Sequence, residues 1–274
     1  MVYTFRQSTL HKRLIIFVFL LILLTTAMPA CSQGQESTLT VFAAAGAKPA
    51  LDEICAAYHE KNNTVVEVTY GGGGEVLSQL ELDRSGDVYV APEQSFMEKA
   101  VGKQLVLPET VTAVAWMVPV IAVPVENLQS ITKLEDLARP GVRVAVTRPE
   151  TTLLGKYAPE IFEKAGLADA IGRNIVTEAA RPDSLLTMLV MGQVDAGILW
   201  NFYEVQSADV ISVIYLAPEQ LIGIGEMRAA VTSFTENEDE AQRFVDYLAS
   251  PDAKETFGRL GYIVDADMLK KYWH

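Results

Sequence analysis

Short apolar runs alternate with segments of helical periodicity along most of the chain. The runs are four to eight residues long and rich in β-branched residues, which predicts strands, whereas apolar residues at helical spacing predict helices. We expect strands at 39–44, 65–70, 87–90, 142–146, 175–178, 196–200 and 229–232. We expect helices at 49–61, 74–83, 95–101, 134–137, 153–165, 182–191, 238–248 and 251–260. This alternation predicts an α/β fold with mainly parallel sheets flanked by helices.

One apolar run is longer than the others. Residues 113–123 contain no charged side chain, and we expect them to form a central strand that crosses between two lobes. A chain of 274 residues is long enough for two lobes of ordinary domain size.

The first thirty residues have the pattern of a signal peptide. Arg6, Lys12 and Arg13 precede an uninterrupted apolar run at 14–24, which is too short to span a bilayer as a helix. Small residues then lead to Ala30-Cys31, which resembles a bacterial lipoprotein cleavage box. We therefore expect a signal peptide at 1–30, lipid attachment at Cys31 and a polar tether at 31–37. Ordinary cleavage near Ala30, leaving Cys31 unmodified, is the alternative.

This targeting segment predicts the location of the protein and bears on its charge. The chain would be secreted across the cytoplasmic membrane and held by its lipid, facing the periplasm or the cell exterior. Residues 1–30 contain three of the 22 Lys and Arg and none of the 35 Asp and Glu, so the remainder has a net charge of 19 − 35 = −16. Such an acidic protein is a poor partner for nucleic acid.

Cys55 lies in an apolar helical stretch and is expected to be a buried small hydrophobic residue.

Signals for catalysis or a protein-bound metal are weak. The three histidines, His11, His59 and His274, are far apart in the sequence. No Cys/His cluster has zinc spacing, no Gly-x-Ser-x-Gly elbow is present, and no loop groups three carboxylates. We therefore expect a binding protein with no cofactor. A two-domain α/β enzyme acting on a phosphorylated or carboxylated small molecule is the less favoured alternative.

Three loops that follow strands and precede helices have unusual sequences, at 43–48, 71–74 and 148–153. Ligands of such sheets bind beside the carboxyl ends of the strands. A helix N-terminus presents unpaired N–H groups and about half a positive charge, so converging termini can hold an anion without a basic side chain. The four consecutive glycines at 71–74 are also consistent with nothing more than a tight turn.

Several segments resemble, in the same order, those of the molybdate/tungstate-binding family, which are type II periplasmic substrate-binding proteins of ABC transporters. The segments are LTVFAAAGAKPAL (39–51), YGGGGEVLSQ (70–79), GDVYVA (86–91), PETTLLGKYA (149–158), GILW (197–200) and FVDYLASP (244–251). The resemblance implies a two-lobed fold, with lobe 1 at 38–117 and 229–274 and lobe 2 at 118–228. It also implies an ABC permease as partner and closure of the lobes around the ligand.

The resemblance further implies the ligand and its contacts. Molybdate or tungstate would be the ligand, and the metal would enter only as part of this oxyanion. The implied contact residues are Gly46, Ala47, Gly73, Gly74, Thr151, Thr152 and Trp200. Serines of the family match Gly46 and Gly73 here, and a tyrosine matches Trp200, whose indole N–H can donate instead.

Other contacts and other ligands are left open by the sequence. Tyr203 or Arg181 could also reach the ligand, and Glu75 suits the first turn of a helix. The alternative ligands are sulfate, phosphate, a metal cation or a small organic acid.

Overall fold

The computed structural model describes residues 37–273, so the predicted signal peptide and Cys31 lie outside the described residues. The strands are β1 (Ser37–Ala44), β2 (Thr64–Gly71), β3 (Val88–Ala91), β4 (Thr112–Met117), β5 (Pro119–Pro124), β6 (Val144–Thr147), β7 (Ile175–Ala179), β8 (Ala196–Trp200), β9 (Ile211–Tyr215) and β10 (Gly225–Val231). The α-helices are α2 (Lys48–Asn62), α3 (Gly73–Asp83), α4 (Gln94–Gly102), α5 (Leu153–Lys164), α6 (Ala168–Gly172), α7 (Pro182–Val190), α8 (Tyr203–Gln206), α9 (Glu238–Leu248), α10 (Pro251–Arg259) and α11 (Ala266–Leu269). Short 3-10 turns are η1 (Ala45–Ala47), η2 (Pro108–Thr110), η3 (Leu134–Ala138) and η4 (Pro218–Gln220).

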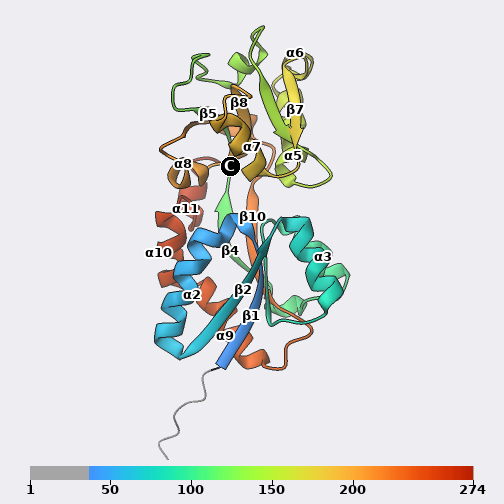
Figure 1. Ribbon diagram of the computed structural model, residues 1–274, viewed down its shortest axis with the longest axis vertical. Coiled ribbons are helices and arrows are strands. Elements are labelled where there is room, and N and C mark those ends of the chain that lie inside the picture. Colours follow the sequence, from blue (N-terminus) through green and yellow to red (C-terminus); the bar gives the residue numbers. More distant parts are fainter. Residues whose placement is uncertain (1–36, 274) are drawn as a thin grey trace, which may run out of the picture. The chain divides into compact units, whose positions relative to one another are not determined.

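These strands form two five-stranded sheets (Figure 1), ordered β2-β1-β3-β10-β4 and β7-β6-β8-β5-β9. In the first sheet only β10 runs against the other strands, and in the second only β5 does. Both sheets are therefore mainly parallel, as the sequence predicts. The reversed strands are the ones that adjoin the two crossings between the sheets.

Helices cover both faces of the first sheet. Along β1, Val41 and Ala43 join the core under α2, α9 and α10, whereas Phe42 points into a second core with side chains of α3 and α4. Figure 1 shows α2 and α10 on one side of these strands and α3 on the other. The alternation of side chains along β1 thus sets the two packing layers.

The first crossing is a break in the expected long strand. Residues 113–123 form two strands, β4 and β5, which belong to different sheets and are separated by Val118. The N–H of Val118 donates to Oδ1 of Asn201 at 2.8 Å, and its carbonyl accepts from the N–H of Asn201 at 3.0 Å. Because Asn201 takes both backbone groups of Val118, the ladder is interrupted there. The Asn201 Nδ2 also donates to the Gly261 carbonyl at 2.8 Å.

The second crossing differs from the expectation. Strand β10 begins at Gly225, earlier than the predicted strand at 229–232, and the edge strand β9 was not predicted. The start of β10 was not predicted because it contains two charged residues, Glu226 and Arg228. In the structure these form an ion pair, with Arg228 Nε 2.7 Å from Glu226 Oε1. We therefore propose that the second lobe boundary lies between β9 and β10.

Between residues 37 and 273, no helix combines the length and apolarity that a bilayer span requires.

Candidate functional site

A cavity of about 370 Å³ lies where strands of both sheets end. Six of the seven predicted contact residues line it: Gly46, Ala47, Gly73, Thr151, Thr152 and Trp200. Gly74 is not in its lining; it lies one residue further into α3. Much of the lining thus comes from the loops that follow β1, β2, β3, β6 and β7, together with the end of β8. These are the carboxyl ends of the strands, where parallel sheets bind ligands.

The two glycines at the positions of the family serines have different surroundings. A Cβ added to Gly46 would meet only Phe202 Cζ, at an ordinary contact distance of 3.6 Å. A Cβ at Gly73 would lie 2.8 Å from both Phe96 Cε2 and Pro92 Cγ. Gly73 therefore permits the close packing of α3 on the loop after β3, whereas Gly46 has room for a side chain.

The start of α3 is capped by Glu75. Its carboxylate accepts from the Gly72 N–H at 3.1 Å, and its side chain is 69% exposed. The N–H groups of Gly73 and Gly74 belong to the first turn of α3 and have no acceptor within the helix. Glu75 therefore acts as a cap, as the sequence suggests.

At the start of α5 the predicted backbone donors are already engaged. The N–H groups of Thr151 and Thr152 donate to the Arg148 carbonyl at 3.2 and 3.1 Å. The Thr152 Oγ1 accepts from the Gly155 N–H at 2.9 Å and caps the helix. The hydroxyls of these threonines are engaged as well, Thr151 with the Ala180 carbonyl at 2.8 Å and Thr152 with the Thr147 hydroxyl at 2.7 Å. Direct binding by this loop would therefore require some of these bonds to break.

Sequence reasoning missed Glu93, which also lines the cavity. It follows β3 and is only 3% exposed. Its carboxylate crosses between the lobes and accepts from the Leu153 N–H at the start of α5, at 3.1 Å. Burial raises the pKa of Glu93 to about 8, although this hydrogen bond opposes the rise. The only signal in the sequence was a carboxylate two residues after a short apolar strand.

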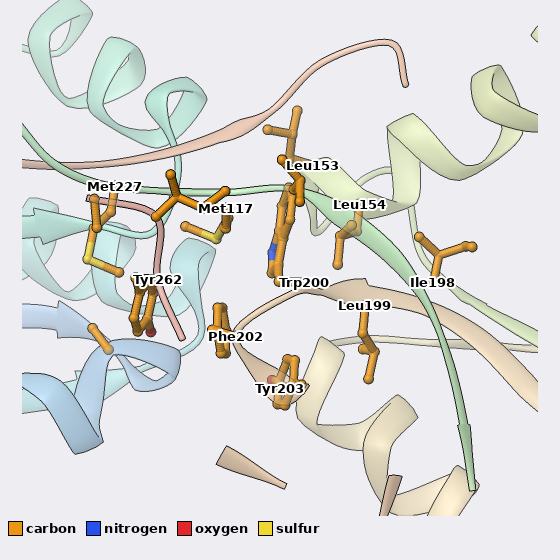
Figure 2. Close-up of a cluster of buried hydrophobic side chains, with 14 of the residues drawn as sticks. Met117, Leu153, Leu154, Ile198, Leu199, Trp200, Phe202, Tyr203, Met227 and Tyr262 are labelled. Atoms are coloured by element: carbon orange, nitrogen blue, oxygen red, sulfur yellow. The ribbon is translucent and has the colours of Figure 1, made fainter. Parts of the chain in front are cut away.

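The second sheet contributes one cation and much of an apolar wall. Arg181 precedes α7 and lines the cavity, where its guanidinium lies 3.1 Å from Asp183 and 3.7 Å from Glu75 of the other lobe. Trp200 is buried at the end of β8, close to Met117 (Figure 2). Large apolar and aromatic side chains line the cavity: Phe96, Met117, Leu186, Trp200, Phe202, Tyr203, Met227 and Tyr262.

This arrangement suits a small anion that has an apolar side. Four helices, α2, α3, α5 and α7, begin at the cavity and direct their positive ends towards it. Within residues 37–273, no three His, Cys, Asp or Glu side chains gather to hold a metal ion. Cys55 lies outside the cavity as a buried free thiol, as predicted, and burial raises its pKa to about 12.

Gly155 offers a test of the local structure beside the site. A Cβ at Gly155 would lie 2.3 Å from the carbonyl atoms of Arg148, so Gly155→Ala must displace backbone. We expect Gly155→Ala to lower the free energy of unfolding by about 1–3 kcal/mol, measured by urea denaturation. Gly172→Ala is the matched control, because no atom lies within 4 Å of the added Cβ. Equal stability of the two variants would contradict this packing.

Comparison with known proteins gives a consistent result. Residues 39–263 match the family model described as bacterial extracellular solute-binding protein. The molybdate-binding protein of Escherichia coli K12 is 26% identical over 247 residues, which cover 88% of this chain and 95% of that protein. The periplasmic molybdate-binding protein of Azotobacter vinelandii has a similar structure, with a TM-score of 0.72 at 18% identity, covering 83% of this chain and 99% of that chain.

A further solved structure shares the fold. Peb3 from Campylobacter jejuni, in its L-phospholactate-bound form, has a TM-score of 0.71 at 19% identity and covers 82% of this chain and 99% of that chain. At these identities the structural likenesses concern the fold alone. They confirm the predicted two-lobed α/β architecture.

Proposed function

Because this chain belongs to the bacterial extracellular solute-binding proteins, we propose that its ligand is a small oxyanion, held in the cavity between the two lobes. The sequence resemblance to the molybdate-binding family is confirmed, and the chain is a substrate-binding protein of an ABC transporter. Its partner in the membrane would be the permease, and its own role would be binding rather than turnover.

The observation that carries this proposal is the convergence of four helix N-termini on one cavity. Each terminus adds a partial positive charge. The N–H groups of Thr151, Thr152 and Leu153 at α5 are already hydrogen-bonded, so the unpaired N–H groups come from other termini. The N–H groups of the Gly46–Ala47 turn and of Gly73 and Gly74 come from one lobe, and Arg181 comes from the other. Together they favour an anion although the whole chain has a net charge of −13.

Molybdate or tungstate is the first candidate ligand. The support is the relationship to molybdate-binding proteins and the presence, in the cavity lining, of six of the seven contact residues that the sequence resemblance implies. Gly46 and Gly73 provide no hydroxyl in place of the family serines. Each lost hydrogen bond to a charged ligand weakens binding by about 1.5–3 kcal/mol, unless water or another donor replaces it.

The direct test is calorimetric titration of residues 38–274, without lipid, with molybdate, tungstate, sulfate, phosphate and Ca²⁺. We expect heat of binding with molybdate and tungstate and none with Ca²⁺. Binding of the cation together with silence towards all four anions would overturn the anion proposal. Incubation with candidate esters should yield no product if the protein only binds.

The apolar wall favours a second candidate, a small organic acid that carries an oxyanion head. The cavity volume of about 370 Å³ lies in the range of sites for small organic molecules. Trp200, Met117 and Met227 could pack against a carbon skeleton while the helix N-termini hold the head. Adding L-phospholactate to the titration separates the two candidates, because the organic acid should then bind more tightly than the bare anions.

We also propose that the protein is exported and attached to the membrane by lipid at Cys31. The support is the order of the basic segment, the short apolar run and Ala30-Cys31. We expect Cys31→Ala to move the protein from the membrane fraction to the soluble fraction and to abolish lipid labelling. Several acyl chains anchor a protein stably, whereas one does so only weakly. A mutant that stays with the membrane would place the anchor elsewhere.

A further inference from the structure

We propose that Glu93 is a proton-dependent selectivity residue: an anion enters the cavity only when the Glu93 carboxyl is protonated, and the carboxyl then donates a hydrogen bond to it. This inference rests on the proposed anion-binding function. It adds that the protein recognises the fully ionised anion by supplying the proton itself.

The position of Glu93 carries the inference. A carboxylate that is 3% exposed lines the same cavity as the helix N-termini of the proposed anion site. One of its oxygens, Oε2, accepts from the Leu153 N–H at 3.1 Å across the lobes. As a charged group it would repel a bound dianion, whereas as a neutral acid it leaves Oε1 to hold the proton and donate.

The groups around Glu93 do not neutralise it. The positive charges of Lys99 of α4 and Lys156 of α5 lower the pKa of Glu93, but burial raises it by more. Tyr89 of β3 and Tyr157 of α5 also lie near Glu93. Burial raises the pKa of both tyrosines, and the negative charge of Glu93 raises it further. Arg181 lines the same cavity and is paired with Asp183.

The direction of the coupling follows from linkage. Burial raises the pKa of Glu93 to about 8, so the carboxyl is mostly neutral at pH 7 and mostly charged at pH 9. If the anion binds only the neutral form, its affinity is constant below pH 7 and falls about tenfold between pH 7 and pH 9. The number of protons taken up per anion bound is then below about 0.1 at pH 6.5 and about 0.9 at pH 9.

The experiment measures both quantities by calorimetry of residues 38–274. Molybdate and sulfate are the probes, because both remain dianions across this range. Titrations at about pH 6.5 and pH 9, each in two buffers of different ionisation heat, give the number of protons bound. We expect the wild type to show the tenfold loss and the uptake at pH 9. Glu93→Gln keeps an oxygen for the Leu153 N–H, so we expect its affinity to be independent of pH and its uptake to be zero.

Glu75→Gln is the matched control, since it removes an exposed carboxylate near the cavity and glutamine can retain the cap. It should keep the pH profile of the wild type. A second readout needs no ligand. The raised pKa of Glu93 makes the folded protein bind more protons than the unfolded chain between about pH 4.3 and 8, so stability is lost across this interval as pH rises. Glu93→Gln should therefore have the higher melting temperature at pH 9.

The outcomes separate the two proposals. Anion binding with equal pH profiles in wild type and Glu93→Gln would overturn the role of Glu93 and leave the anion function standing. Silence of every anion in both proteins would overturn both. Anion binding by both proteins, with a pH profile and proton uptake only in the wild type, would support both.

Discussion

Replacing Gly46 by serine is expected to tighten the binding of molybdate by about ten- to a hundredfold. The new hydroxyl would stand in the cavity at the start of α2, where the added Cβ meets only Phe202 Cζ at 3.6 Å. A hydrogen bond to a charged group contributes about 1.5–3 kcal/mol, and about 1.4 kcal/mol corresponds to a tenfold change in affinity. Calorimetric titration of the variant with molybdate measures the gain.

Two variants control for this gain. Gly46→Ala adds the carbon without the hydroxyl and should leave the affinity near that of the wild type. Gly73→Ser supplies a hydroxyl at the other position of the family serines, but its Cβ would collide with Phe96 and Pro92, so we expect reduced stability. If Gly46→Ser and Gly46→Ala bind molybdate equally, the anion does not lie beside residue 46.

Removing the side chain of Asn201 is expected to give the largest loss of stability. Asn201 is 4% exposed, and Asn201→Ala would leave the Val118 N–H and the Gly261 carbonyl without their partner. Each abandoned buried group costs about 1–3 kcal/mol, so we expect a loss of about 2–6 kcal/mol in the free energy of unfolding.

Thermal and urea unfolding measure this loss. Gln206→Ala is a suitable control in the same region, because the hydrogen bond of Gln206 to the Leu260 carbonyl is longer, at 3.3 Å. Its loss should be no more than about 1 kcal/mol. Comparable losses in the two variants would mean that Asn201 does not hold the crossing together.

The sequence could predict the fold because local pattern and global architecture agree. β-Branched runs ended where the loops at 43–48, 71–74 and 148–153 began, and those loops preceded helices. The residues of these loops were therefore expected near one another, and the structure places Gly46, Gly73 and Thr152 around one cavity. Periodicity alone was sufficient for this step, since parallel strands end at one edge of a sheet.

Other features depended on contacts that periodicity does not encode. Nothing in the sequence around Glu93 says that its carboxylate would be buried against α5. Likewise, the Arg148 carbonyl takes the N–H groups of Thr151 and Thr152, which sequence reasoning had assigned to the ligand. The start of β10 was hidden because Glu226 and Arg228 look like surface charges until they are seen paired. Tertiary contacts decided each of these cases.

The position of β10 constrains the order in which the chain can fold. This strand lies between β3 and β4, although more than a hundred residues separate it in sequence from either of them. The second sheet, by contrast, takes all its strands from the continuous stretch 119–215. During synthesis from the N-terminus, the second sheet can therefore be completed first. Until β10 has been made, β3 and β4 each have one edge without its hydrogen-bonded neighbour. Closing so long a loop is slow, and unpaired edges invite aggregation, so the interval before β10 arrives is the most vulnerable stage of folding.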